Sequence, residues 1–285
     1  MWMKWLWNRV RRARLERIHD GKILATRRWR EGEIIKVRMA KLSSTFDVER
    51  EMWIPATRWL TEQNLGYKRE FRVPWGICDL VGVGWSHERV SNRRLRRQKT
   101  PIGPPGRVAL LQRVPDEQSG RSITIDELCV TFMQSPDWVT REVKSLISGN
   151  FVKRHSDGSL TSSVSWAPLH TCIVAVELKL DRIDEAISQA RSHVAFATES
   201  YVGFPTTVAD RIMSSHHADI LRAAGVGLLS VTNSGVTVMA EPVMCSSILR
   251  DHVLQMHCVE RFWPQIEVDL TVGSRDNVGR KSETQ

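Results

Sequence analysis

The stretch Val174-Ala-Val-Glu-Leu-Lys-Leu180 carries an acid and a base inside an otherwise apolar run. Side chains of a β-strand alternate between its two faces, so Glu177 and Lys179 share one face while the apolar residues between and beside them share the other. Charges in an apolar strand are costly unless they pair or hold a ligand such as a metal ion. The stretch therefore predicts a strand with a charged site on one face.

A second carboxylate, Asp79, lies in another apolar strand pattern, Ile77-Cys-Asp-Leu-Val-Gly-Val-Gly-Trp85. Two carboxylates from neighbouring strands suit Mg²⁺, with Mn²⁺ as the alternative ion, because such hard cations prefer oxygen ligands. A bound ion lowers the pKa of its water and neutralises phosphate charge. A lysine beside it positions or deprotonates the attacking water, or stabilises charge on phosphorus. This set indicates phosphodiester hydrolysis.

The Glu-x-Lys spacing alone carries little information. Glu142 and Lys144 have the same spacing, but they fall in a predicted helix, where the two side chains diverge by about 200°. They cannot converge on one ligand. Glu177 and Lys179 differ from that pair because a strand places both side chains on one face, and because Asp79 lies in a second apolar strand.

Asp79, the run Glu177-Leu178-Lys179 and a following helix that carries Gln189 resemble the PD-(D/E)xK nuclease superfamily. The resemblance implies an α/β protein with a restriction-endonuclease-like mixed sheet flanked by helices. It implies that Asp79 and Glu177 bind the metal ion together with the Leu178 carbonyl, and that Lys179 is the catalytic lysine.

Two further residues are candidates for the same site. In some branches of the superfamily a glutamine in the position of Gln189 supports the site and is followed four residues later by tyrosine, where this chain has His193. The alternative for Gln189 is an exposed or helix-capping side chain. Glu49 shares a helix face with apolar residues and corresponds to the acid that related enzymes place on their first helix. Glu51 and Glu70 are rivals for that role.

Two features depart from the family pattern. Cys78 replaces the proline of the signature, and 98 positions separate Asp79 from Glu177. An inserted domain accounts for this distance, because the two ends of an insertion lie close together on the host. Between Pro104 and Trp166, a helix, a capped helix, a turn, a second capped helix and a hairpin resemble a winged helix-turn-helix domain.

The inserted domain and the basic segment before it supply the predicted DNA contacts. The expected recognition helix, Ser135-Pro-Asp-Trp-Val-Thr-Arg-Glu-Val-Lys144 and onward, has Val139, Val143 and Leu146 on its inward stripe. For each candidate the alternative is ordinary exposed surface. The candidate DNA-binding residues are Trp138, Arg141, Lys144, Lys153, Arg154, Arg93, Arg94, Arg96 and Arg97.

Charge is concentrated near the N-terminus. The chain has 285 residues and a net charge of +9, and residues 1–41 hold thirteen Lys or Arg against four Asp or Glu, a surplus of nine. Together with the basic run 91–113, this favours a polyanionic partner, most simply duplex DNA. The alternative is that these basic segments are a solvent-exposed tail and linker without a binding role. A further alternative for the N-terminal segment is an amphipathic helix that lies at a membrane surface, with Trp2, Trp5 and Trp7 on its apolar face.

Several classes of protein are disfavoured. The chain has no apolar run of eighteen residues and no secretory leader pattern, so we expect a cytoplasmic protein without a membrane span. Five scattered cysteines predict neither a disulfide framework nor a zinc knuckle, but buried apolar residues in a reducing compartment. No phosphate-binding GxxxxGK[ST] loop is present, and the adjacent pair His216-His217 lacks a third metal ligand.

The remaining patterns predict an α/β domain. Residues 46–65 predict a helix with a kink or restart at Pro55, residues 67–85 a β-hairpin, and 182–197 a helix before a short strand. A single helix over 207–225, two strands joined at 233–235 and a helix over 247–262 follow. The predicted boundaries are a basic leader 1–42, a nuclease-like domain 43–90 and 168–262, a linker with the inserted domain 91–167, and a tail 263–285.

The leading prediction is a metal-dependent DNA endonuclease whose inserted domain binds the duplex, with a homodimer left open. The first alternative is a DNA-binding transcriptional regulator on a nuclease-like scaffold, with Glu177 and Lys179 as a plain ion pair. The second is an RNA-directed nuclease or binder. Winged helices favour duplex DNA only by analogy of fold.

Overall fold

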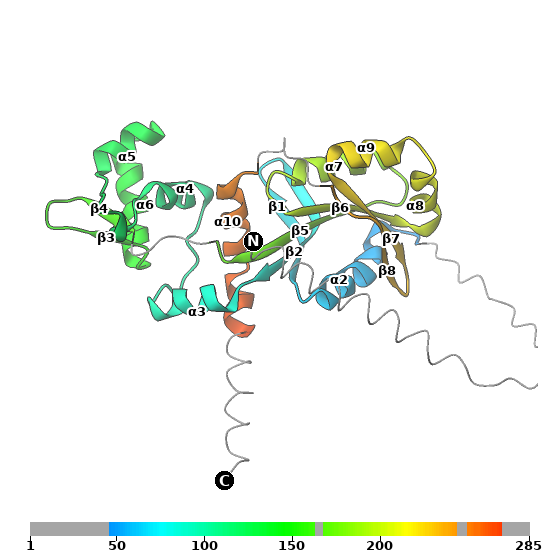
Figure 1. Cartoon of the computed structure of the whole chain (residues 1–285), viewed down its shortest axis with the longest axis horizontal. Helices are drawn as coiled ribbons and strands as arrows, with labels where there is room; N and C mark the ends of the chain where they lie inside the picture. Colours follow the sequence, from blue (N-terminus) through cyan, green and yellow to red (C-terminus); the bar gives the residue numbers. More distant parts are fainter. Residues whose placement is uncertain (1–45, 163–167, 244–249, 270–285) are drawn as a thin grey trace, which may run out of the picture. The chain divides into compact units, whose positions relative to one another are not determined.

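A mixed sheet of six strands dominates the computed structural model, which describes residues 46–162, 168–243 and 250–269 (Figure 1). The strand order is β1-β2-β5-β6-β7-β8, with parallel pairing only for β5-β6 and β6-β7. A separate hairpin pairs β3 with β4. The strands are β1 (Gly66–Val73), β2 (Gly76–Trp85), β3 (Val152–Arg154), β4 (Leu160–Ser162), β5 (His170–Leu178), β6 (Glu199–Pro205), β7 (Val226–Thr232) and β8 (Gly235–Ala240).

The helices fall before, between and after these strands, so the predicted α/β class with a mixed sheet flanked by helices is confirmed. No helix in the described ranges has the length and apolarity needed to cross a bilayer. The helices are η1 (Glu49–Met52), α2 (Trp53–Glu62), α3 (His87–Leu95), α4 (Pro105–Arg113), η2 (Glu117–Ser119), α5 (Ile125–Phe132), α6 (Pro136–Ser148), α7 (Ile183–His193), α8 (Thr206–Met213), α9 (His217–Ala224) and α10 (His252–Glu260).

The alternation of side chains along β5 sorts them onto two faces of the sheet, as the sequence predicts. Val174, Val176 and Leu178 pack in one apolar cluster with residues of α2. Ile173 and Ala175 pack in another cluster with residues of α10. Helices α7, α8 and α9 pack against β6 and β7 (Figure 1). Because Glu177 alternates with Leu178, it points away from the α2 face and toward the face that α7 covers.

The predicted β1-β2 hairpin is confirmed, and it has an irregularity beside the predicted site. Arg69 pairs with Leu80 and Phe71 pairs with Cys78, which leaves Glu70 opposite Asp79. Glu70 has φ of 49°, in the left-handed region that non-glycine residues seldom adopt. Such departures from regular pairing are common next to functional sites, where they redirect a side chain.

Helices α4, α5 and α6 and the hairpin β3-β4 form a third apolar cluster of their own. The predicted caps are confirmed: Thr124 and Glu127 form a capping box, and the Ser135 hydroxyl accepts a hydrogen bond from the Trp138 N–H. The predicted inward stripe is also confirmed, since Val139, Val143 and Leu146 are buried. Helix α10 joins the two regions, because its Met256 packs in this third cluster while its Val259 packs under the main sheet.

The predictions were wrong at several boundaries. The basic run that begins at Ser91 is not an irregular linker throughout, since its start lies on α3 and its end on α4. The single helix expected over 207–225 is two helices, which separate at residues 214–216. Helix α10 begins later than expected, where the Asp251 carboxylate accepts hydrogen bonds from the N–H groups of Val253 and Leu254.

The helix expected over residues 46–65 is shorter and has two parts. A turn of 3₁₀-helix, η1, precedes α2, and Pro55 lies in the first turn of α2, where a missing N–H costs no hydrogen bond. The expected restart of the helix is therefore confirmed. The basic leader 1–42, with Trp2, Trp5 and Trp7, and most of the expected tail lie outside the described residues.

Candidate active site

The candidate site lies where β2 and β5 cease to pair. Their ladder runs as far as Leu80 opposite Val176, and Asp79 and Glu177 come next on each strand. The Asp79 carboxylate oxygen Oδ2 accepts a hydrogen bond of 2.8 Å from the Leu178 N–H. This bond fixes the Asp79 carboxylate against the end of β5, beside the two charged residues that flank Leu178.

Lys179 is the centre of this cluster of charges. Its Nζ lies 2.8 Å from Glu177 Oε1, 3.8 Å from Asp79 Oδ2 and 3.9 Å from Glu49 Oε2. Glu177 and Lys179 are 1% and 5% exposed, so this is a buried ion pair. The side chains of Asp79 and Glu49 are 23% and 33% exposed, which leaves the site open to solvent on their side.

The charges shift one another's pKa. Burial, and after it the negative charge of Glu177, raises the pKa of Asp79 to about 6. Burial would also raise the pKa of Glu177, but hydrogen bonds from His193 and Lys179 outweigh it and lower the pKa. Burial works against the charged form of Lys179, yet the hydrogen bond and charge of Glu177 prevail and raise the Lys179 pKa. At neutral pH the Lys179 ammonium therefore lies beside the ionised carboxylates of Asp79 and Glu177.

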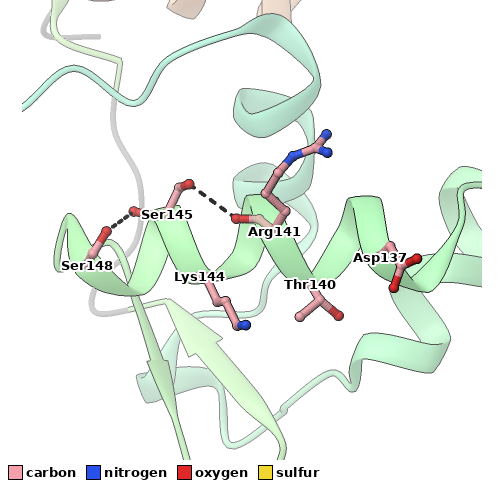
Figure 2. A pocket seen from close by; sticks show the side chains of 6 residues that line it. All are labelled: Asp137, Thr140, Arg141, Lys144, Ser145 and Ser148. Atoms are coloured by element: carbon pink, nitrogen blue, oxygen red, sulfur yellow. Dashed lines mark hydrogen bonds between the residues drawn. The ribbon is translucent and has the colours of Figure 1, made fainter.

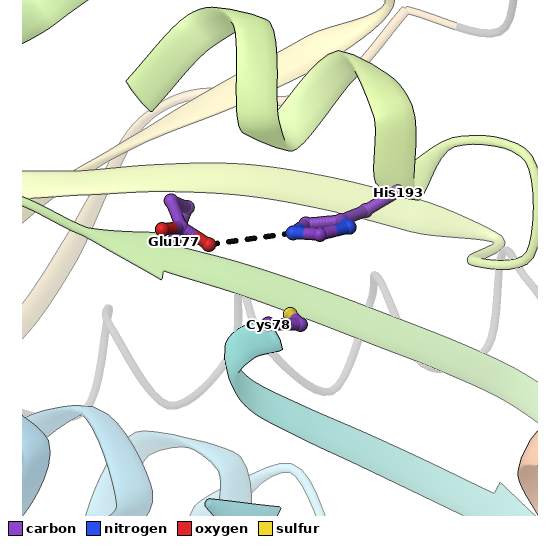
Figure 3. A group of neighbouring side chains, drawn as sticks. All are labelled: Cys78, Glu177 and His193. Atoms are coloured by element: carbon purple, nitrogen blue, oxygen red, sulfur yellow. Dashed lines mark hydrogen bonds and ion pairs between the residues drawn. The ribbon is translucent and has the colours of Figure 1, made fainter. Parts of the chain in front are cut away.

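His193 and Cys78 complete the inner side of the cluster (Figure 3). The second carboxylate oxygen of Glu177, Oε2, lies 3.3 Å from His193 Nε2, which α7 brings over β5. The Cys78 thiol comes from the start of β2, and all three residues are buried, with potential ligand atoms within 4.8 Å of one another. Sequence reasoning noticed these two residues only as departures from a family pattern, and their positions beside Asp79 and after Gln189 were the available signal.

The other residues predicted for the site differ in their proximity to it. Glu49 belongs to the cluster through Lys179, and its Oε1 also accepts a hydrogen bond of 3.1 Å from Arg182 Nη2. The two other candidates for the acid of the first helix do not join the cluster. Glu51 accepts hydrogen bonds from backbone N–H groups at the start of η1, and Glu70 is exposed. Gln189 lies one turn before His193 on α7, and its buried Oε1 has no hydrogen-bond partner within the described ranges.

The exposed face of α6 carries a shallow hollow of about 550 Å³ (Figure 2). Arg141 and Lys144, two of the predicted DNA contacts, are exposed there. Arg141 is also 3.2 Å from the buried Glu142, so part of its charge is compensated. The lining residues are Asp137, Thr140, Arg141, Lys144, Ser145 and Ser148.

Two residues predicted to contact DNA take part in packing between helices. Arg93 is 3% exposed and its guanidinium pairs with both carboxylate oxygens of Glu260, at 2.5 and 2.9 Å, while it stacks 3.9 Å from the Trp263 ring centre. Trp138 is half-buried and packs against the third apolar cluster, close to Gly106 of α4. Burial removes Arg93 from the surface, whereas Trp138 stays partly exposed and remains a candidate.

The remaining basic candidates are exposed. Arg94, Arg96 and Arg97 lie at the end of α3 and just after it, and Arg154 ends β3. Lys153 is exposed too, but its Nζ pairs with Glu117 at 2.7 Å. These residues stay candidates for phosphate contact.

The site is assembled from β2, β5, η1 and α7, elements that lie far apart in the sequence. The Leu178 carbonyl stays a predicted metal ligand, beside the Leu178 N–H that holds Asp79. Comparison of the chain with models of protein families, with curated proteins and with solved structures gave no match.

Proposed function

We propose that this protein is a metal-dependent DNA endonuclease of the PD-(D/E)xK type, which hydrolyses phosphodiester bonds. One observation carries the proposal: Asp79, Glu177 and Lys179 come together around the Lys179 ammonium, although 98 residue positions separate the two acids. A plain ion pair needs only Glu177 and Lys179. The additional carboxylates of Asp79 and Glu49 add negative charge at the solvent-facing side, which favours a cation.

The donor atoms on that side suit Mg²⁺ or Mn²⁺. Asp79 and Glu49 contribute carboxylate oxygens that are partly exposed, and hard cations of this class prefer oxygen ligands and retain several waters. Asp79 and Glu177 would hold the ion, with the Leu178 carbonyl as a further ligand. A bound ion of this kind supplies a water of lowered pKa and neutralises charge on the scissile phosphate.

Lys179 acts in this proposal as a fixed positive charge. Its raised pKa keeps it protonated at neutral pH, so it is unsuited to remove a proton from water. An ammonium held 2.8 Å from Glu177 is instead placed to stabilise the negative charge that develops on the phosphate oxygens. This favours one of the roles for the lysine that the sequence left open.

The arrangement of elements supports the proposed restriction-endonuclease-like fold. A helix, α2, precedes the strands β1, β2 and β5, and then α7 and β6 follow. The catalytic carboxylates would lie on two adjacent strands of one sheet. Residues 91–167 fall between β2 and β5, as an insertion into this order would.

The insertion is proposed to be a winged helix-turn-helix domain that binds duplex DNA. Its helices α4, α5 and α6 and the hairpin β3-β4 share one apolar cluster, and α6 presents Arg141 and Lys144 outward. The exposed Arg94, Arg96 and Arg97 lie just before it in the chain and add positive charge. Phosphate neutralisation by such side chains supplies most of the sequence-independent affinity for DNA.

Cleavage of supercoiled plasmid by the full chain tests the proposal. We expect nicked and linear DNA with Mg²⁺ or Mn²⁺ and none with excess chelator. Glu177→Gln should reduce the cleavage rate at least about 100-fold, the loss that follows removal of one charge-stabilising group. Glu62→Gln, which neutralises an exposed acid of α2, is the matched control. Parallel reactions with single-stranded DNA and duplex RNA identify the substrate class.

A non-catalytic DNA-binding regulator is the second candidate. It is favoured by the geometry of Glu177, whose two oxygens are already engaged by Lys179 and His193. Duplex binding through α6 without cleavage, across Mg²⁺, Mn²⁺ and all three substrates, would support this reading and refute the nuclease.

A further inference from the structure

Glu177 has two sides, and its inner side has a chemistry different from its outer side. The outer side faces the Lys179 ammonium and the carboxylates of Asp79 and Glu49, whose only ligand atoms are oxygens. The inner side faces the imidazole of His193 and the thiol of Cys78 (Figure 3). Sulfur and imidazole nitrogen are poor ligands for Mg²⁺ but good ones for Zn²⁺ and similar transition metals.

We propose that Cys78, Glu177 and His193 form a binding site for a thiophilic divalent cation of the Zn²⁺ class. The three residues come from β2, β5 and α7, and each is at most 2% exposed. A sulfur, an oxygen and a nitrogen donor from three separate elements make a set that packing alone does not require. Catalytic and inhibitory zinc sites commonly have three protein ligands and one open position.

The distances fit after a small movement. The three potential ligand atoms lie within 4.8 Å of one another, and the Glu177 Oε2 to His193 Nε2 distance is 3.3 Å. Zinc bonds of about 2.0–2.3 Å at tetrahedral angles place ligand atoms about 3.3–3.8 Å apart. The carboxylate and imidazole therefore have that separation already. The thiol lies within 4.8 Å of both and has to approach by as much as about 1 Å.

His193 faces the site through its Nε2, which lies 3.3 Å from Glu177 Oε2. Its Nδ1 is buried without a hydrogen-bond partner in the described part of the chain. The ring otherwise lies edge-on to Phe196, with ring centres 5.8 Å apart. The contact of Nε2 with Glu177 is therefore the one polar interaction of this buried ring within the described ranges.

The Cys78 thiol is the third donor of the set. It is fully buried and donates its proton to the carbonyls of Leu80, at 3.3 Å, and Val176, at 3.7 Å. A divalent cation replaces that proton, because a coordinated thiol is deprotonated outright. The negative charge then lies against the cation, not alone in an apolar environment.

A consequence for cleavage rests on the proposed function. Because Glu177 is shared, a cation bound to its inner oxygen competes with the ion that the nuclease would hold outside. Zn²⁺ is then an inhibitor of Mg²⁺-dependent cleavage. Cation binding itself does not depend on the protein being a nuclease, so the two claims separate experimentally.

Co²⁺ titration of the full chain under reducing conditions tests the site, since Co²⁺ replaces Zn²⁺ and reports a bound thiolate by a sulfur-to-metal absorption band. We expect one equivalent to produce the band and Zn²⁺ to abolish it. Cys78→Ser and His193→Asn should weaken Co²⁺ binding at least about tenfold, the lower end of losses caused even by outer partners of a ligand. Absence of the band in the unsubstituted chain would overturn the proposal.

Controls separate this site from other thiols and from the nuclease centre. Cys172→Ser, on β5, should keep the band, as should Asp79→Asn, which is expected to abolish cleavage. Persistence of the band in Cys78→Ser would assign it to another cysteine and refute the site. Should Cys78→Ser fail to fold, Cys78→Ala fills the buried position without a polar atom. Its melting temperature should then not respond to Zn²⁺, whereas that of the unsubstituted chain should rise.

Discussion

Asp79 is bound to Leu178 through a side-chain-to-backbone hydrogen bond of 2.8 Å, across 99 positions of sequence. The bond crosses from β2 to β5 just past the last paired residues of the two strands. It fixes a partly exposed carboxylate beside the buried pair of Glu177 and Lys179. The sheet itself therefore fixes the site. It holds charged side chains in place although burying a charge costs free energy.

Asp79→Asn should stabilise the fold at neutral pH. The pKa of Asp79 rises from 3.8 to about 6, so the folded state disfavours the ionised carboxylate, and this cost is present above pH 6 and vanishes below the unfolded pKa near 4. We expect urea denaturation at pH 8 to give Asp79→Asn about 1–2 kcal/mol more stability than the unsubstituted chain, after allowance for partial exposure. An equal difference at pH 3.5 would contradict this account.

The same titration predicts the acid limb of cleavage. A metal-binding carboxylate must be ionised, and ionisation of Asp79 is lost as pH falls through about 6. At subsaturating Mg²⁺, the initial rate should fall about tenfold for each unit below that pH. Saturating Mg²⁺ should move the midpoint lower, because the ion favours the ionised form. A rate that is flat between pH 5 and 7 would exclude Asp79 as the titrating ligand.

Lys179→Met should destabilise the protein by roughly 3–5 kcal/mol, since it leaves the carboxylate of Glu177 buried with one oxygen unpaired. Glu177→Gln in the same chain removes that charge and should restore part of the loss. A double-mutant cycle by urea denaturation at pH 7.5 measures the coupling between the two residues. A coupling near zero would mean that the pair contributes nothing to the fold.

Arg141→Ala combined with Lys144→Ala should weaken duplex binding through α6. Each phosphate contact contributes about −0.9 to the slope of log affinity against log salt. Loss of two contacts should therefore flatten that slope by about 2. Arg211→Ala, an exposed arginine on α8 outside the inserted segment, is the control and should leave the slope unchanged. Fluorescence anisotropy with a labelled duplex makes the comparison, and identical slopes would exclude this face of α6.

Arg93 should matter for stability and not for DNA affinity. Arg93→Ala leaves Glu260 as a buried carboxylate without its guanidinium partner, and should cost roughly 3–5 kcal/mol. Arg93→Lys keeps the charge but loses the two-pronged pairing, so its loss should be smaller. Urea denaturation ranks the variants. If folded Arg93→Lys bound duplex DNA much more weakly than the unsubstituted chain, Arg93 would have a role in DNA binding despite its burial.

Local patterns predicted the parts of the fold that depend on local physics. The alternation in β2 and β5 and the caps at Thr124 and Ser135 follow from strand periodicity and from the unpaired N–H groups of a helix start. The convergence of Asp79 with Glu177 was expected from a family resemblance. No local pattern shows which strands become neighbours.

Contacts across long distances in sequence account for what was missed. Arg93 looks like any other member of a basic run, and only its pairing with Glu260, 167 positions away, buries it. His193 and Cys78 meet at Glu177 because α7 crosses the end of β5, which depends on the packing of the whole sheet. The break between α8 and α9 occurs at serines, which interrupt a helix only weakly.

Single-turnover cleavage of an end-labelled duplex by three near-isosteric variants tests the central claim most directly. With Mg²⁺ present and folding verified by circular dichroism, Asp79→Asn, Glu177→Gln and Lys179→Met should each cut at least about 100-fold more slowly than the unsubstituted chain. Asp126→Asn, at an exposed position of α5, should cut at the full rate. Undiminished cleavage by the three folded variants would show that these residues are not the catalytic centre.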